Sequence, residues 1–383
     1  MAGEVSERTG YSLETVMRDF DFVSSLLRAD VLERALDCSL PGGAASLEGP
    51  VEVAPGEFYR SLPAGPVLVI GSGNSAVPAL ISAALSLLTG NLTLVRPSRS
   101  NSPAVREVVE AVPEPLSGGI FLVKSDPEGA LLRYLLESAP VGVVNVWGGA
   151  EAVSAVCSRA ASNPARPRVV AFGPMVGYAV VEEGADLGEA ADALAEAVSL
   201  YDQQLCSSPV EAAFVGSRGA AEEFCSLLAE AMGEWAERLP IELGEYGAHL
   251  IQSLRRVAAL SGSRVYAPRG PEWTVLLSEG PTALAEAARL GLSLAARRRL
   301  IEVVRADSED YVVRRVGELA SLLGVDGVQT VGVAPGEAIP RLARALGVHR
   351  VVPLRGMHVR PPLEPLDGVH LAREFVRVAY WRV

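Results

Sequence analysis

Cys206 lies in the segment whose residue types are best suited to covalent chemistry. It occurs in Tyr-Asp-Gln-Gln-Leu-Cys-Ser-Ser-Pro, residues 201–209, directly after a run with helical composition. Small residues after a helix predict a turn that exposes the sulfur, and a thiolate can attack a carbonyl or thioester carbon. The commoner role of any single cysteine is to pack as a small apolar side chain. From the spacing alone, both interpretations stay open.

Asn74 lies in a turn that follows a short apolar run, residues 67–70. Such a run predicts a strand buried on both faces, and open α/β sheets bind their ligands at the carboxyl ends of strands. A side-chain amide at this place could donate a hydrogen bond to an oxyanion that forms on a bound acyl group. The alternative is an asparagine that serves only the backbone of the turn.

Two further segments combine strand ends with groups that suit a nucleotide phosphate. Arg96 and Ser98 follow the predicted strand 92–95, and a guanidinium can bind two phosphate oxygens at once. Gly148 and Gly149 precede a predicted helix, whose first backbone N–H groups could hold a pyrophosphate. A solvated arginine and an ordinary diglycine turn are the alternatives. The chain has no complete G-x-G-x-x-G motif.

The elements that must position these residues alternate between strand and helix in the first half of the chain. Apolar runs and helical spacing predict strands at 67–70, 92–95, 120–123, 141–146, 168–172 and 178–181, and helices at 15–38, 77–88, 103–112, 128–137 and 151–161. Alternation of this kind favours a mainly parallel sheet with helices on both faces.

The pattern changes in the second half, where the helical runs are longer. Helices are predicted at 187–204, 220–239, 244–260 and 282–300, and strands at 210–215 and 274–277. Further alternation covers 311–352. We place a domain boundary within 173–177, and the length of 383 residues also favours two domains over one.

Charge and composition exclude several classes of function. A net charge of −12 opposes binding to nucleic acid or to an anionic membrane, because both would repel the protein. The chain has one lysine, Lys124, so a Schiff-base enzyme would depend on that residue. The four cysteines and four histidines show no metal-ligand spacing, and we expect no metal site.

The cysteines, the N-terminal segment and residues 61–95 together predict a reduced, cytoplasmic protein without a membrane span. Residues 1–11 are polar and charged, unlike a signal peptide. Residues 61–95 carry no charge, but prolines, glycines and polar residues interrupt them. A helix that faces lipid would tolerate that mixture badly.

Four blocks, in this order, resemble the aldehyde dehydrogenase superfamily, and most closely its acyl-CoA reductases of the LuxC type, which are related to the fatty-acid reductase of bacterial luminescence. Residues 68–98 resemble the superfamily's strand, asparagine turn, helix and "GN…KPS" block, and residues 144–153 its "N…GG" turn. Residues 201–209 resemble the reductases' "DQQ-C-SP" nucleophile block. Residues 327–368 are similar to their C-terminal "LQTVG…GV.R…G.M…DG" pattern.

The resemblance implies an α/β fold of the aldehyde dehydrogenase type. We expect N-terminal helices and a Rossmann-type, parallel-sheet domain for the nicotinamide cofactor within residues 1–175, and an α/β catalytic domain within 176–354. The C-terminal segment, 355–383, would join subunits into a homo-oligomer. Proteins that transfer acyl groups are the partners that the resemblance implies.

The resemblance also implies a role for each candidate residue. Cys206 would be the nucleophile that accepts the acyl group, and Asn74 would donate to the oxyanion beside the backbone amide of Cys206. Arg96 and Ser98 would face the ribose and phosphate end of the cofactor. Gly148 and Gly149 would hold its pyrophosphate.

Two departures from the superfamily pattern refine these expectations. Arg96 replaces the lysine of "KPS", which favours NADPH as the cofactor, with NADH as the alternative. The chain has Ala-Phe-Gly-Pro at 171–174 where hydrolytic members have "ELGG". The missing glutamate activates water in those members, so its loss fits a reductase that exchanges acyl groups with CoA.

These features together predict an aldehyde-forming oxidoreductase. It would reduce an acyl-CoA, with a fatty acyl chain, to the aldehyde with NADPH through a thioester on Cys206. One alternative is a reductase of an acyl phosphate or another activated carboxylate. A second alternative is an inactive member of the superfamily that serves as a binding or assembly subunit.

Overall fold

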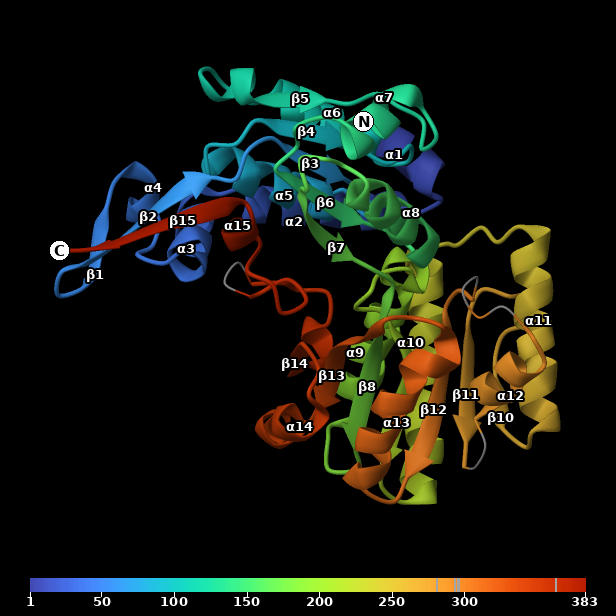
Figure 1. The fold of residues 1–383 in the computed structure, drawn as a ribbon. Helices are drawn as coiled ribbons and strands as arrows, with labels where there is room; N and C mark the ends of the chain where they lie inside the picture. Colours follow the sequence, from blue (N-terminus) through green and yellow to red (C-terminus); the bar gives the residue numbers. More distant parts are fainter. Residues whose placement is uncertain (280–281, 293, 295–296, 362–363) are drawn as a thin grey trace. The chain divides into compact units, whose positions relative to one another are not determined.

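The computed structural model describes residues 1–279, 282–292, 294, 297–361 and 364–383, and the chain forms two units (Figure 1). The first unit comprises Met1–Thr9, Val16–Gly173 and Pro361–Val383. The second comprises Gly10–Thr15 and Pro174–Arg360. The chain therefore leaves the first unit after Gly173 and returns to it for its last residues.

A five-stranded parallel sheet forms the centre of the first unit, in the order β5-β4-β3-β6-β7. Its strands are β3 (Val67–Ile70), β4 (Thr93–Arg96), β5 (Ile120–Leu122), β6 (Val143–Trp147) and β7 (Arg168–Phe172). All four residues of β3 are buried, as its uninterrupted apolar sequence predicts. The strand order reverses between β3 and β6, and doubly wound sheets bind ligands at that point, outside the carboxyl ends of the strands.

Helices of the first unit precede these strands, connect them or, in the case of α15, follow them in the chain. They are α1 (Ala2–Thr9), α2 (Leu13–Leu26), α3 (Ala29–Ser39), α4 (Ala45–Glu48), α5 (Val77–Leu88), α6 (Ser102–Glu110), α7 (Ala130–Glu137), α8 (Ala150–Ala161) and α15 (Leu371–Glu374). Helices α7 and α8 pack with β3 and β6 in one apolar core. The first three residues of α2 belong to the second unit.

The first unit also contains an antiparallel sheet that sequence analysis did not predict. It consists of β1 (Val51–Ala54), β2 (Glu57–Pro63) and β15 (Val376–Arg382), in the order β1-β2-β15. Figure 1 shows β2 and β15 side by side, although they come from opposite ends of the chain. Phe58 faces Trp381, with their stacked rings 5.8 Å apart. The partner of β2 is distant in sequence, so no local pattern could reveal the pairing.

A seven-stranded sheet forms the centre of the second unit, in the order β10-β11-β12-β9-β8-β13-β14. Its strands are β8 (Met175–Glu182), β9 (Pro209–Val215), β10 (Arg264–Tyr266), β11 (Thr274–Ser278), β12 (Leu300–Ala306), β13 (Gly327–Ala334) and β14 (Arg350–Pro353). All neighbours are parallel except β10, which pairs antiparallel with β11.

Helices cover both faces of this second sheet (Figure 1). They are α9 (Leu187–Ser199), α10 (Arg218–Arg238), α11 (Glu245–Leu260), α12 (Ala283–Arg289), α13 (Glu309–Leu323) and α14 (Ile339–Leu346). One apolar core joins α13 and α14 to β8 and β13, and another lies between α11, α12 and β11. Among the described residues, no helix is both long and apolar enough to cross a membrane.

Three predicted helices are too long, and each ends where the backbone takes another conformation. The helix predicted at 15–38 is two helices, because Arg28 is extended (φ −68°, ψ 142°). The helix predicted at 187–204 ends at Ser199, where Leu200 is extended. The helix predicted at 282–300 ends at Arg289, and Leu300 already belongs to β12. Apolar spacing detected these segments but not their breaks.

Candidate active site

Cys206 lies in the connection between α9 and β9, and the backbone before it has an uncommon conformation. Tyr201, Asp202 and Gln203 have φ angles of +53°, +48° and +63°. Left-handed conformations are uncommon for residues other than glycine; each costs about 1–3 kcal/mol and persists only where surrounding contacts offset that cost. Three in succession therefore require strong tertiary contacts. We call residues 200–208 the nucleophile loop.

The buried side chain of Gln203 supplies the first of these contacts. Its Nε2 donates to the backbone oxygens of Pro209, at 2.7 Å, and Leu300, at 2.8 Å. Its Oε1 accepts from the backbone N–H of Leu300 at 3.0 Å. Pro209 begins β9 and Leu300 begins the adjacent strand β12, so this amide attaches the nucleophile loop to the amino ends of two parallel strands.

The buried ion pair between Asp202 and Arg299 supplies the second of the tertiary contacts that impose this backbone conformation. Arg299 donates from Nε to Asp202 Oδ1 at 3.0 Å, and from Nη1 to the backbone oxygen of Leu239 at 2.6 Å. Burial raises the pKa of Asp202 above its ordinary value, and the guanidinium opposes part of that effect. Asp202 is thus engaged in fixing the loop.

The turn around Cys206 closes on itself through Ser208. The backbone N–H of Leu205 donates to Ser208 Oγ at 3.2 Å, and the backbone N–H of Ser208 donates to the Leu205 oxygen at 2.9 Å. Ser208 is fully buried, whereas Cys206 between these residues is half-buried. The sulfur therefore lies on a turn whose flanks are anchored in the core of the unit.

Ser207 joins the nucleophile loop to His358, which is 151 residues away in sequence. Ser207 Oγ lies 2.9 Å from His358 Nδ1, and His358 Nε2 lies 2.8 Å from the backbone oxygen of Ala197. A carbonyl oxygen can only accept, so Nε2 carries the proton and Nδ1 accepts from the Ser207 hydroxyl. Burial lowers the pKa of His358 to about 4, which keeps the ring neutral at physiological pH.

The other cysteines differ from Cys206 in their surroundings. Cys225 is buried within α10, and burial raises the pKa of its thiol to about 12. It is therefore an unreactive packing residue. Cys38 is exposed on α3 and Cys157 is half-buried on α8, both on helices of the other unit. Of the four, Cys206 is the one on an anchored turn just before the start of a strand, β9.

The remaining predicted site residues, Asn74, Arg96, Ser98, Gly148 and Gly149, all belong to the first unit and lie at one edge of its sheet. Arg96 ends β4 and is the register partner of Ile70, the last residue of β3. Asn74 lies in the turn after β3, and the two glycines follow the adjacent strand β6. The structure thus brings these five residues to the carboxyl edge of three neighbouring strands, at the point where the strand order reverses.

Asn101, which sequence analysis did not select, positions the turn that contains Asn74. Its Nδ2 donates to the backbone oxygens of Ser72, at 3.2 Å, and Gly73, at 3.1 Å. Ser100 Oγ also donates to the Gly73 oxygen, at 2.9 Å. Asn101 is buried just before α6, and its place ahead of Ser-Pro at a predicted helix start was its only signal in the sequence.

Helices α5 and α8 both begin at this edge of the sheet, but they differ in whether a side chain already caps their first N–H groups. Asp19 accepts hydrogen bonds from Ser75 Oγ and from the backbone N–H of Ala76, so a carboxylate covers the start of α5. Helix α8 instead begins after Gly149, which has no side chain to cap it. A Cβ added at Gly149 would meet no described atom within 4 Å. The start of α8 therefore fits a cofactor pyrophosphate, since backbone N–H groups at a helix start favour an anion.

Asn145 fixes the strand that leads to these glycines. Its Nδ2 donates to the Val170 oxygen on β7 at 3.1 Å, and its Oδ1 accepts from Trp147 Nε1 at 2.9 Å. The Trp147 ring stacks on Phe172 with the centroids 3.7 Å apart. The asparagine of the "N…GG" block thus ties β6 to β7 beside the glycine turn.

Arg96 and Ser98 have surroundings that fit a ribose or phosphate group. Arg96 is half-buried, burial lowers its pKa, and its Nε donates to the Ser125 oxygen at a long 3.4 Å. Ser98 Oγ lies 3.3 Å from Ser100 Oγ and accepts from the backbone N–H of Asn101. A guanidinium with one weak protein contact retains donors for an anion.

Comparisons with known proteins identify the family and the fold of the chain. The family model of the acyl-CoA reductase (LuxC) matches residues 2–378. The long-chain acyl-protein thioester reductase of Vibrio harveyi is 28% identical over 233 residues, which cover 58% of this chain and 47% of that protein. The same enzyme of Photorhabdus luminescens is 25% identical over 229 residues, 58% of this chain and 46% of that protein. The chain spans about half the length of the curated relatives it matches.

Solved structures are similar over the whole chain. An oxidoreductase from Marinobacter aquaeolei has a TM-score of 0.78 at 15% identity, over 99% of this chain and 81% of its own. Aldehyde dehydrogenase C of Pseudomonas syringae, solved with NAD+ and octanal, has a TM-score of 0.73 at 16% identity, over 100% and 80%. The predicted fold class and family are thus confirmed: the chain has the aldehyde dehydrogenase fold and belongs to the acyl-CoA reductase (LuxC) family.

Proposed function

We propose that this protein reduces a long-chain fatty-acyl thioester, such as an acyl-CoA, to the aldehyde, with Cys206 as the acyl acceptor and NADPH as the reductant. The observation that carries this proposal is the position of Cys206, half-buried on a turn that buried contacts anchor to β9 and β12. Family membership and curated relatives that act on long-chain acyl thioesters support it.

In the proposed reaction the Cys206 sulfur attacks the carbonyl carbon of the donor thioester. A new carbon–sulfur bond forms, the carrier's thiolate leaves and takes up a proton, and the acyl group remains on Cys206. The side chain of Asn74 and the backbone N–H of Cys206 would donate to the oxyanion that develops during this step. Formation of a covalent intermediate divides a difficult reduction into two easier steps.

The cofactor's reduced nicotinamide, when bound, supplies the hydride that converts the enzyme thioester to a thiohemiacetal. Gly148 and Gly149 at the start of α8 would hold its pyrophosphate, and Arg96 and Ser98 its ribose and phosphate end. The carbon–sulfur bond of the thiohemiacetal then breaks with its electron pair on the Cys206 sulfur, the hydroxyl loses its proton as the carbonyl forms, and the aldehyde is released. The guanidinium of Arg96, which keeps the charge of the lysine and can bind two oxygens of a 2′-phosphate at once, is the feature that favours NADPH over NADH.

Ala171 supports reduction over hydrolysis. It lies on β7 where hydrolytic members of the superfamily have a glutamate, and its methyl group cannot activate water. A thioester on Cys206 would therefore persist until it is reduced or returned to a thiol. The cytoplasmic location remains a prediction from the N-terminal segment and the cysteines. The homo-oligomer and the acyl-transfer partners remain predictions from the resemblance.

Intact-protein mass spectrometry after incubation with long-chain acyl-CoA, without cofactor, tests the proposal. We expect one acyl adduct per chain on the native protein and none on Cys206→Ala, while both bind NADPH equally. Cys157→Ala, which alters another half-buried cysteine, is the matched control and should retain the adduct. An undiminished adduct on Cys206→Ala would overturn the proposed role of this residue.

The same experiment separates the alternatives. Acylation by an acyl phosphate but not by a thioester would favour a reductase of activated carboxylates. Absence of any adduct, with folded protein, would favour a binding or assembly subunit. Turnover assays with NADPH and NADH then identify the cofactor.

A further inference from the structure

Arg297, Arg298 and Arg299 lie next to the nucleophile loop, at the amino end of β12. Arg299 is neutralised by Asp202 of the loop. The backbone oxygen of Arg297 accepts from Gln204 Nε2 at 3.3 Å, two residues from Cys206. Arg298 is half-buried and lies close enough to Asp202 to influence its pKa. Three positive charges thus lie next to the nucleophile loop, and the carboxylate of Asp202 in this loop is paired with one of them, Arg299.

The guanidinium of Arg297 is buried without a counter-charge. The residue is 7% exposed, and its Nη1 donates to the backbone oxygen of Leu294. Its Nε is buried and has no acceptor among the described residues, and no carboxylate there forms an ion pair with it. Burial lowers its pKa to about 10, so it is still charged at neutral pH. An unpaired buried charge opposes folding, so its presence calls for a functional explanation.

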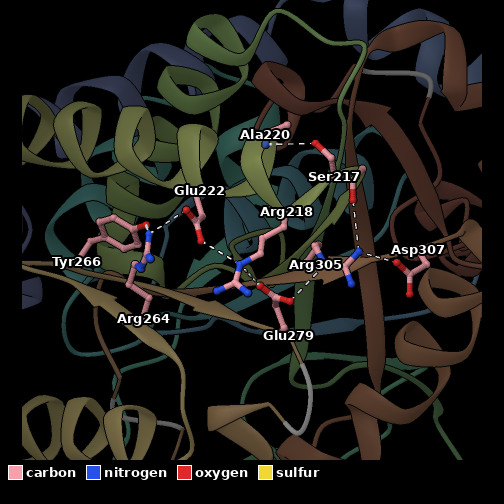
Figure 2. Close-up of polar contacts among 10 residues, drawn as sticks. Ser217, Arg218, Ala220, Glu222, Arg264, Tyr266, Glu279, Arg305 and Asp307 are labelled. Carbon is pink, nitrogen blue, oxygen red and sulfur yellow. Dashed lines mark hydrogen bonds and ion pairs between the residues drawn. The ribbon is translucent and has the colours of Figure 1, made fainter.

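Arginines at the opposite end of the same sheet behave differently (Figure 2). Arg218 follows β9, Arg305 is near the end of β12 and Arg264 lies on β10. Each has at least one carboxylate within ion-pair distance, such as Glu279 at 3.0 Å from Arg218. The carboxylates of this network are Glu222, Glu279 and Asp307. The charges there neutralise one another, whereas Arg297 has no such partner.

We propose that Arg297 and Arg298 form an anion subsite beside the nucleophile loop, which binds a phosphate group of a reactant. A guanidinium binds phosphate oxygens through parallel charge-assisted hydrogen bonds, and the bound anion would supply the missing counter-charge. The inference rests on the proposed function, since an acyl thioester of CoA or of a phosphopantetheine arm carries phosphate together with its acyl chain. A dinucleotide cofactor is the other source of the same group.

Calorimetric titration of the full chain with CoA, pantetheine and NADPH tests the subsite. In Arg297→Met we expect the affinity for CoA to fall about tenfold or more, while that for pantetheine, which has no phosphate, stays unchanged. Arg305→Met, from the neutralised network, is the matched control and should bind CoA as the native protein does. A loss confined to NADPH would assign the phosphate to the cofactor. Unchanged affinity for both phosphate ligands would overturn the proposal.

Thermal unfolding without ligand separates this role from a structural one. Removal of an unpaired buried charge should leave the midpoint of Arg297→Met equal to or above that of the native protein. A lower midpoint together with unchanged CoA affinity would identify a structural arginine and contradict the subsite. Arg298→Met, at a half-buried position, gives a second variant whose CoA affinity should also fall.

The result is independent of the proposed chemistry at Cys206, because CoA without an acyl group binds but does not react. If the native protein forms no acyl adduct yet Arg297→Met still weakens CoA binding, the proposed function fails and the subsite stands. A phosphate-free thioester, acyl-N-acetylcysteamine, should acylate the native protein and Arg297→Met equally. If acyl-CoA acylates only the native protein efficiently, both the proposed function and the subsite are supported.

Discussion

Glu211 and Glu302 are register partners on the adjacent parallel strands β9 and β12, and both side chains are fully buried. Arg315 of α13 donates to both carboxylate oxygens of Glu211, at 2.8 and 2.6 Å. Glu302 accepts instead from Ser278 Oγ and from two backbone N–H groups at the start of α12. Burial and the nearby charge of Glu211 raise the pKa of Glu302 to about 7.

The raised pKa of Glu302 contributes a loss of stability as the pH rises from about 4.5 to about 7, and this contribution opposes that of His358. In this window the folded state keeps a proton that the unfolded chain, with an ordinary value of 4.5, has released. The contribution of Glu302 to the free energy of unfolding should decrease by up to about 3 kcal/mol across this window. Urea unfolding at pH 5, 6, 7 and 8 measures the slope. Glu302→Gln should remove this contribution, so that its free energy of unfolding at pH 8 relative to pH 5 exceeds that of the native protein by up to about 3 kcal/mol. Glu318→Gln, at an exposed position, should leave this difference unchanged.

His358 contributes a dependence of the free energy of unfolding on pH that has the opposite sign, between about pH 4 and pH 6.5. Its folded pKa of about 4 lies below the ordinary value of 6.5, so between these pH values the imidazole is protonated in the unfolded chain and neutral in the folded protein. The stabilisation is complete above pH 6.5 and is lost as the pH falls toward 4, by up to about 3 kcal/mol. His358→Gln retains an amide donor and an acceptor, and its unfolding free energy should fall less in this window. His249→Gln, on the surface of α11, should behave like the native protein; an identical fall in His358→Gln would refute this account.

Gln203→Glu should be strongly destabilising, although the side chain keeps its size. The carboxylate cannot donate, so the buried oxygens of Pro209 and Leu300 would lose their donor and face a negative charge. Each unsatisfied buried group costs about 1–3 kcal/mol. Chemical unfolding should therefore show a loss of at least about 3 kcal/mol. Gln204→Glu, at a half-buried position with bonds of 3.3 Å, should lose clearly less; equal losses would contradict the anchoring role of Gln203.

The ion pair between Asp202 and Arg299 predicts a strong coupling in a double-mutant cycle. Asp202→Asn keeps a residue type that tolerates the left-handed conformation but leaves a buried guanidinium unpaired, which costs about 3–5 kcal/mol. Arg299→Met leaves a buried carboxylate and should cost a similar amount. The double variant should lose less than the sum of the two. Additive losses, measured by urea unfolding, would show that the pair does not stabilise the loop.

Local sequence patterns predicted most strands and helices, because the buried face of a strand or helix has apolar residues at a regular spacing along the chain. Val67–Ile70 and Val77–Leu88 were predicted with their observed bounds, since an uninterrupted apolar run and helical spacing are local properties. The break after Ser199 was missed, because the side chains that impose the left-handed backbone bind to strands almost 100 residues later. The pairing of β2 with β15 was missed for the same reason.

The fold class, the family and the candidate residues could be predicted before the structure was known, because these depend on residue types and on spacing along the chain. Tertiary structure alone decided which groups hold the nucleophile loop. Gln203 was visible only as part of a motif, and Ser207 had no recognisable partner until folding brought His358 to it. It also decided that Arg297 is buried without a counter-charge among the residues that the structure describes. Burial and pairing of charges depend on residues far apart in the chain, and no local pattern encodes them.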